Sequence, residues 1–110
     1  MFDKTQLMRG SLEGCVLKII EHQTTYGYEI LEQLHQYGFA DVSEGTIYPI
    51  LLRLEKTGNI TSQLRTSPLG PKRKYYTISD TGREHLASFY ACWKSVERSV
   101  HAIFKEDEES

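Results

Sequence analysis

The chain has 110 residues and a formal net charge of −2, with 25% charged and 39% hydrophobic residues. This length suits one domain, and the composition is that of an ordinary globular protein, which excludes a largely disordered chain. No apolar stretch reaches the ~18 residues of a membrane-spanning helix and no cationic start precedes an apolar run, so we expect a soluble cytoplasmic protein with no membrane partner.

The charges are distributed unevenly along the chain. Residues 1–42 carry three cations and six carboxylates, residues 43–79 carry six and two, and residues 80–110 carry four and seven. The middle segment is therefore basic by four charges and lies between two segments that are each acidic by three. Because a local excess of cations acts over roughly 8–10 Å, this segment is a candidate surface for an anionic partner.

Two amphipathic helices are expected before residue 40. Residues 5–22 place aliphatic side chains near helical spacing, namely Leu7, Met8, Leu12, Val16, Ile19 and Ile20. Residues 25–37 open with Thr25 as a candidate N-cap. They end before Gly38, a residue suited to the left-handed conformation that follows many helices.

A third helix is expected over residues 43–57, with Ser43 as its candidate cap and Gly58 after its end. Its inward stripe consists of Ile47, Ile50, Leu51 and Leu54, and its opposite face carries Gly45, Pro49 and Lys56. Pro49 lacks the N–H that would bond the carbonyl of Gly45, which disfavours a helix interior by ~3 kcal/mol. Either the first turn is distorted, or the regular helix begins nearer Tyr48.

The outer face of this helix has two interpretations. In the functional one, the small or flat groups let the backbone approach DNA, while neighbouring side chains reach phosphates or base edges. The candidate DNA contacts are Ser43, Thr46, Tyr48, Pro49 and Arg53. In the other interpretation, this is a surface helix with a local kink.

A β-hairpin is expected next, because polar and apolar residues alternate over residues 60–65 and 75–78 on either side of "TSPLGPK". Lys72, Arg73 and Lys74 lie at its tip and outer arm, with no acidic residue within several positions. Solvated loop cations would also fit this pattern. Together with the third helix, however, these three cations favour a nucleic acid as the partner.

The order of elements is helix, helix, helix, strand, strand, helix, the last capped by Ser79 and ending near residue 104 before an acidic tail. This predicts a mostly α fold with a small β-hairpin (α+β), the winged helix-turn-helix, in which the third helix enters the major groove of DNA. We expect residues 1–78 to form the DNA-binding domain and residues 79–110 a C-terminal dimerisation helix with its acidic tail.

The last helix carries a heptad pattern, with Leu86, Trp93 and Val100 spaced by seven, and likewise Phe89, Val96 and Ile103. The pattern is also compatible with a helix that packs only on its own domain. We expect a homodimer, because this helix outruns what three short helices can cover. The expected interface residues are Leu7, Met8, Leu12, Leu86, Phe89, Trp93, Val96, Val100 and Ile103.

Three segments resemble one known family. "YGYEI" at 26–30, "EGTIYPILLRLEKTG" at 44–58 and "GPKRKYYTISDTG" at 70–82 are similar, in order and separation, to the signature segments of the PadR family of bacterial transcriptional regulators. The resemblance implies a homodimeric winged helix, usually a repressor, that binds an inverted-repeat operator and releases it on meeting a small effector. It implies DNA contacts for Thr46, Tyr48 and the wing cations, and makes Pro49 a usual family residue. The single C-terminal helix resembles the short subfamily.

Trp93 is the only tryptophan. In multidrug-binding short members of the family, a tryptophan at the matching position lines a cavity between subunits and stacks on flat aromatic ligands. The resemblance therefore implies a small aromatic or hydrophobic effector bound by Phe89, Tyr90, Trp93 and Val96. Alternatively, Trp93 only fills the dimer core.

Other functions find less support in the sequence. An enzyme is not expected, because the four histidines are scattered and no nucleophile, base and orienting carboxylate form a recognisable motif. Cys15 and Cys92 lack clustered partners and are expected to be buried reduced thiols, so no metal and no cofactor is expected. A winged-helix metal or redox sensor, or a winged helix used only for protein contacts, remain the alternatives.

Overall fold

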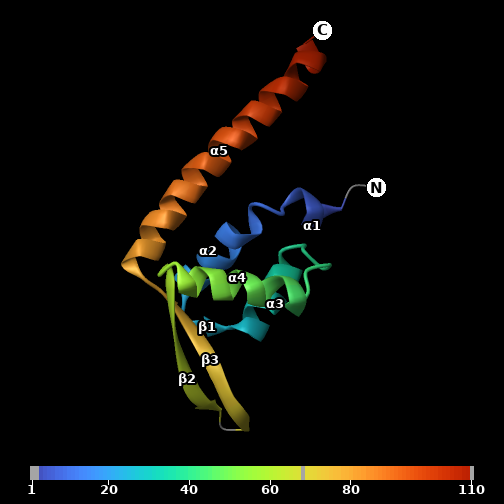
Figure 1. The fold of residues 1–110 in the computed structure, drawn as a ribbon. Coiled ribbons are helices and arrows are strands. Elements are labelled where there is room, and N and C mark those ends of the chain that lie inside the picture. The colour runs from blue at the N-terminus through green and yellow to red at the C-terminus, as the bar shows by residue number, and fades with distance from the viewer. Residues whose placement is uncertain (1–2, 68, 110) are drawn as a thin grey trace.

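The computed structural model describes residues 3–67 and 69–109 and shows an α+β winged helix with a long C-terminal helix, which confirms the predicted fold class (Figure 1). The elements are α1 Lys4–Leu7, α2 Leu12–His22, β1 Thr25–Tyr26, α3 Gly27–Gln36, α4 Glu44–Lys56, β2 Ile60–Ser67, β3 Gly70–Ile78 and α5 Asp80–Glu109. The β2–β3 hairpin, which forms the wing, and α5 project from the helical body in opposite directions (Figure 1). Residue 68, in the predicted turn, lies outside the described residues.

The core lies where α2, α3 and α4 meet the base of the sheet and the first turns of α5. Its apolar side chains are at most 8% exposed, and they include the predicted inward stripe of the third helix, Ile47, Ile50, Leu51 and Leu54. Burial of this stripe fixes the opposite face of α4 toward solvent, which is the orientation that a DNA-reading helix needs.

The sheet has three strands in the order β1-β3-β2, all antiparallel, where the sequence predicts only two. The additional strand pairs Thr25 with Tyr76 and Tyr26 with Tyr75. Thr25 is therefore not the N-cap of α3. It lies in β1 with 1% exposure, and its hydroxyl donates to Glu29 Oε1 at 2.5 Å. Two residues are too few to show an alternating pattern in the sequence.

The first predicted helix is interrupted. α1 ends at Leu7 and α2 begins at Leu12, with turns in between that include Gly10, a residue that disfavours helix interiors. Leu12 is 4% exposed and belongs to the core, whereas Leu7 is 69% exposed. Of the expected interface residues on this segment, Leu12 is therefore unavailable to a second chain.

α4 is helical from Glu44 and contains Pro49. The helix therefore begins before Tyr48, contrary to the alternative that placed its start nearer that residue. Ser43 occupies the N-cap position, but its side chain makes no capping bond to the backbone. Helices α3 and α4 are followed by Gly38 and Gly58 with φ angles of 104° and 78°, which confirms the predicted ends.

α5 is capped as predicted, since Ser79 Oγ accepts the N–H of Gly82 at 3.0 Å and donates to the carbonyl of Gly58 at 2.6 Å. The helix continues past the predicted end to Glu109, because the acidic residues that follow include no helix breaker. Leu86 is 6% exposed and belongs to the core. Like Leu12, it is therefore buried within one chain and not available to the expected dimer interface.

Candidate nucleic-acid interface

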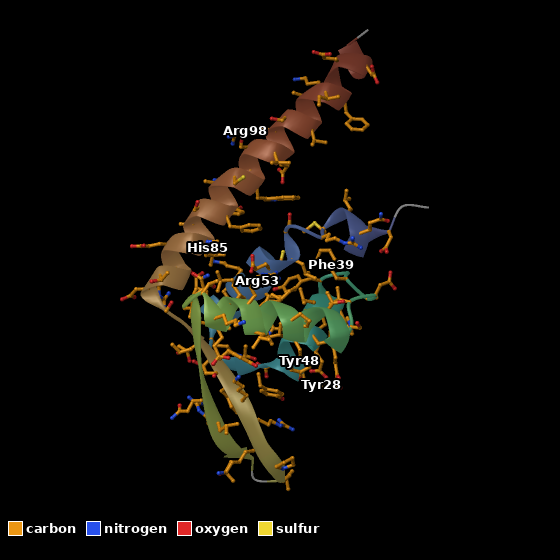
Figure 2. The ribbon with its side chains drawn as sticks, viewed as in Figure 1. Tyr28, Phe39, Tyr48, Arg53, His85 and Arg98 are labelled. Atoms are coloured by element: carbon orange, nitrogen blue, oxygen red, sulfur yellow. The ribbon has the colours of Figure 1, made fainter. Side chains whose placement is uncertain are left out.

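A hollow of about 280 Å³ lies where α3 begins, beside α4 and the wing. Tyrosines and cations line it: Tyr26, Gly27, Tyr28, Tyr48, Lys72, Arg73, Lys74 and Tyr76. Figure 2 shows Tyr28 and Tyr48 near one another on the wing side of the helices. The structure therefore brings Tyr48 of the predicted recognition helix together with all three predicted wing cations.

Tyr48 lies over the first turn of α3. A Cβ atom at position 27 would lie 3.0 Å from Tyr48 Oη, so the absence of a side chain at Gly27 makes room for the phenol. Tyr48 is nevertheless 48% exposed, and Tyr28 is 54% exposed. Both tyrosines are thus partly open to solvent, and a phenol hydroxyl can donate a hydrogen bond to an anion.

The solvent-facing side of α4 is small and apolar around Tyr48. Gly45 and Pro49 are exposed, as predicted, and Leu52 is 60% exposed. Leu52 was not among the predicted contacts, although its position four residues after Tyr48 places both on the same face of the helix. This face can approach a groove closely and can contact thymine methyl groups.

Lys74 does not carry a free charge, contrary to the expectation for the wing. Its Nζ lies 2.9 Å from Glu55 Oε1, and the other carboxylate oxygen accepts the hydroxyl of Ser62. The Ser62 hydrogen bond, followed by the bond from Lys74, lowers the pKa of Glu55, and Glu55 raises the pKa of Lys74. One carboxylate on α4 therefore holds both strands of the wing.

Lys72 and Arg73 are exposed side chains of β3, and neither forms an ion pair with any residue that the structure describes. The guanidinium carbon of Arg73 lies 4.6 Å from the ring centroid of Tyr26. Tyr26 and Tyr28 are functional candidates that the sequence interpretation missed. Their signal was the pair of aromatic residues on either side of Gly27, at the start of a helix.

Arg53 lies apart from this group. Its Nε donates to Glu13 Oε1 at 3.0 Å, and Figure 2 shows it on the other side of α4 from Tyr48. Thr46, seven residues before Arg53, shares the Arg53 side of the helix and is partly buried. Ser43 is exposed at the start of α4, with its hydroxyl 3.5 Å from Thr46 Oγ1.

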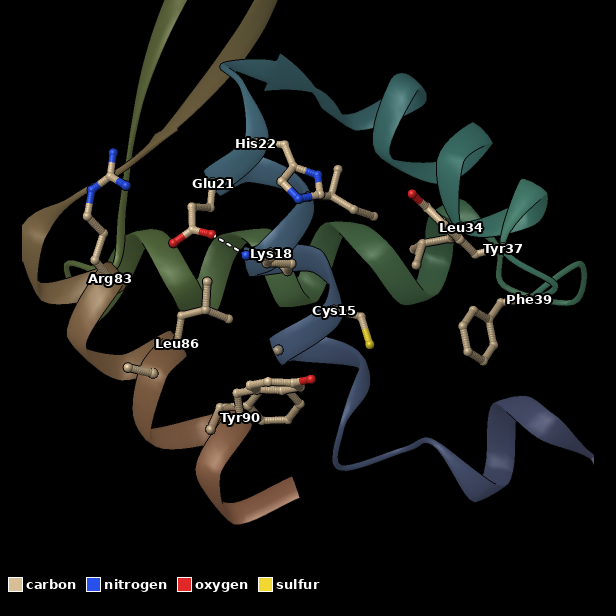
Figure 3. A pocket seen from close by; sticks show the side chains of 14 residues that line it. Cys15, Lys18, Glu21, His22, Leu34, Tyr37, Phe39, Arg83, Leu86 and Tyr90 are labelled. Carbon is tan, nitrogen blue, oxygen red and sulfur yellow. Dashed lines mark hydrogen bonds and ion pairs between the residues drawn. The ribbon is translucent and has the colours of Figure 1, made fainter. Parts of the chain in front are cut away.

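The four predicted effector residues divide between two other hollows. One, of about 650 Å³, lies between the N-terminal segment and α5 and is lined in part by Met8, Trp93 and Val96. The other, of about 700 Å³, lies between α2, the end of α3 and the first turns of α5, and Tyr90 faces it (Figure 3). Phe89 lines both hollows.

The two cysteines are free, but only one is sheltered. Cys15 is partly buried, and burial raises the pKa of its thiol. Cys92 is exposed on α5, so the expectation of two buried thiols is wrong for it. In the described part of the chain, no three His, Cys, Asp or Glu side chains form a group that could hold a metal ion.

Residues 16–88 match the transcriptional regulator PadR-like family, and this match covers more than half of the chain, from within α2 to the first turns of α5. The chain belongs to this family. PadR-like proteins are DNA-binding transcriptional regulators and not enzymes, and the hollow between α4 and the wing accordingly lies on the DNA-binding fold itself.

Solved structures resemble this PadR-like regulator over nearly its whole length. A PadR-like transcriptional regulator from Bacillus cereus is 47% identical, with a TM-score of 0.81 over 90% of this chain and 96% of its own. A Streptococcus transcriptional regulator is 42% identical, with a TM-score of 0.80 over 91% and 98%. An uncharacterised protein of Lysinibacillus sphaericus is 29% identical over 99 residues. Among the described residues no helix is long and apolar enough to cross a membrane.

The Glu55 contacts predict a pH-dependent stability. Because the folded pKa of Glu55 lies below its ordinary value of 4.5, its contribution is present above that pH and is lost as the pH falls through the folded pKa. Glu55→Gln should lower the Tm by roughly 4 °C at pH 7, which corresponds to less than about 1 kcal/mol for this part-exposed group.

The difference from wild type should shrink below pH 4.5 in thermal melts followed by circular dichroism. Glu32→Gln, at an exposed position on α3, is the matched control and should leave the Tm nearly unchanged. If the Tm of Glu55→Gln stayed below that of the wild type by the same amount at every pH, the carboxylate charge would not be what holds the wing.

Proposed function

We propose that this PadR-like regulator is a homodimeric repressor that binds an inverted-repeat operator through α4 and the wing, and that a small aromatic or hydrophobic effector releases it. The observation that carries the proposal is the hollow in which Tyr48 of α4 faces Lys72 and Arg73 of the wing. A helix that reads base edges and a strand that binds phosphates need this adjacency.

The DNA contacts divide by chemistry. Tyr48 and Pro49, with Leu52 beside them, contact the base edges or the groove wall, and Ser43 and Thr46 lie at the start of the same helix. Lys72 and Arg73 bind phosphates, because no carboxylate of the described residues neutralises them. Lys74 and Arg53, which are bound to Glu55 and Glu13, orient the wing and α4.

Dimerisation is supported by the apolar side of α5 that the chain itself leaves open. Val96 and Val100 are each 48% exposed, Ile103 is 67% exposed and Phe104 is 66% exposed, and Leu7 on α1 is 69% exposed. Contiguous apolar surface of this kind marks an interaction site. A two-fold pairing of α5 helices would present two copies of α4 to one side of a duplex, ~34 Å apart if both enter successive turns of the major groove.

The effector site is supported by the hollow that contains Trp93. Its volume of about 650 Å³ lies within the range of small-molecule sites, and its walls include Phe89, Val96 and Phe104. A second α5 packed over these side chains would close the hollow with apolar groups. A ligand bound there would then change the relative position of the two subunits, and therefore the distance between the two α4 helices.

Substitution of Tyr48 tests the DNA contact. Tyr48→Ala should weaken binding to a duplex that the wild type has selected from a random pool, by roughly tenfold or more, and should weaken binding to a random duplex much less. Fluorescence anisotropy measures both affinities. Tyr37→Ala removes a tyrosine that is 70% exposed and lies outside the hollow, and it should leave both affinities unchanged. Equal losses on the two duplexes would contradict a specifying role for Tyr48.

The effector site can be tested through Trp93, which is the sole source of tryptophan emission. Planar aromatic compounds should quench that emission and release the selected duplex over the same range of concentration. Tyr90→Phe, which alters a side chain that faces the other hollow, should leave the quenching unchanged. Unaltered emission across a broad panel of such compounds would contradict an effector site at Trp93.

A further inference from the structure

One face of the three-stranded sheet carries two arginines and two tyrosines. Because side chains alternate along a strand, Arg73 and Tyr75 lie on the face opposite Lys74. In the register of the sheet, Arg65 is directly opposite Arg73 and Tyr26 is directly opposite Tyr75. Three strands therefore contribute to a single row of cationic and aromatic side chains.

Each guanidinium of this row lies over a tyrosine ring. The Cζ atom of Arg65 is 4.9 Å from the centroid of Tyr75, and that of Arg73 is 4.6 Å from the centroid of Tyr26. The two rings meet edge to face with their centroids 5.4 Å apart. Stacking uses the flat face of a guanidinium and leaves the N–H donors at its edge available for hydrogen bonds.

The two arginines have no counter-charge within the described parts of the chain. Ion pairs engage Lys18, Arg53 and Lys74, whereas none among the described residues engages Arg65 or Arg73. Like charges directly opposite one another destabilise a strand pair. An external anion would remove this repulsion, and planar guanidinium groups with free edges suit phosphate oxygens better than a lysine does.

We infer that Arg65 and Arg73 together bind the phosphates of a DNA backbone, with Tyr75 and Tyr26 as the platforms that hold the two guanidinium groups in place. This rests on the proposed DNA-binding role of the wing and adds Arg65, from the other strand, to it. Arg73 and its platform Tyr26 also line the hollow beside α4, so the row begins at that hollow and Arg65 extends it to β2. The wing therefore contacts the backbone through both of its strands.

The test compares Arg65→Ala with Arg98→Ala, which removes one exposed cation from α5, far from the wing (Figure 2). Affinities for the selected duplex and for a random duplex are measured by anisotropy over a series of KCl concentrations. Arg65→Ala should weaken binding to both duplexes by about tenfold and make the slope of log affinity against log salt shallower by about 0.9, the value for one lost phosphate contact. Arg98→Ala should change neither.

Two further variants sharpen the comparison. Arg65→Lys should retain most of the salt slope but lose affinity, because it keeps the charge without the planar fork. If thermal melts show that Arg65→Ala does not fold, Arg65→Gln replaces it. Equal behaviour of the Arg65 and Arg98 variants would overturn the arginine row and leave the proposed function standing. A wild type that bound no duplex would overturn both.

Discussion

α5 is joined to the winged helix by the contact of the Phe89 ring with the backbone of α2 at Gly14. A Cβ atom at position 14 would lie 2.2 Å from Phe89 Cε2, so only a glycine lets the ring approach this closely. Leu86, one turn earlier, is buried, whereas the side chains beyond Trp93 on the same side of the helix are exposed. Together with the packing of Gly82 against the carbonyl of Asn59, this crossing sets the direction in which α5 projects, and hence where a second chain could stand relative to α4.

The elements proposed to face DNA form one body on the other side of this crossing. Glu55 joins α4 to both strands of the wing, and the contact of Tyr26 with Tyr75 joins the wing to the segment that opens α3. Arg53, bound to Glu13, joins α4 to α2 as well. A displacement of α5 relative to α2 would therefore move α4 and the wing together, which is how an event at the α5 hollows could change DNA affinity without reshaping the reading surface.

The sequence predicted what local patterns control and missed what distant contacts control. The three-helix order, the ends at Gly38 and Gly58 and the cap at Ser79 follow from neighbouring residues. The bond from Lys74 to Glu55 joins residues 19 positions apart. It pairs one of the three wing cations, which the local sequence did not indicate. A heptad pattern likewise does not tell whether a side chain packs within its own chain, as Leu86 does, or is available to a second chain.

We propose that two copies of this chain place their α4 helices and wings on one operator. Hydroxyl-radical footprinting of the wild type on a duplex that it has selected tests this most directly. A dimer on an inverted repeat should protect two segments related by a two-fold axis, with centres about one helical turn, roughly 10 base pairs, apart on the same face of the DNA. A single protected segment, or protection spread evenly along the duplex, would contradict it.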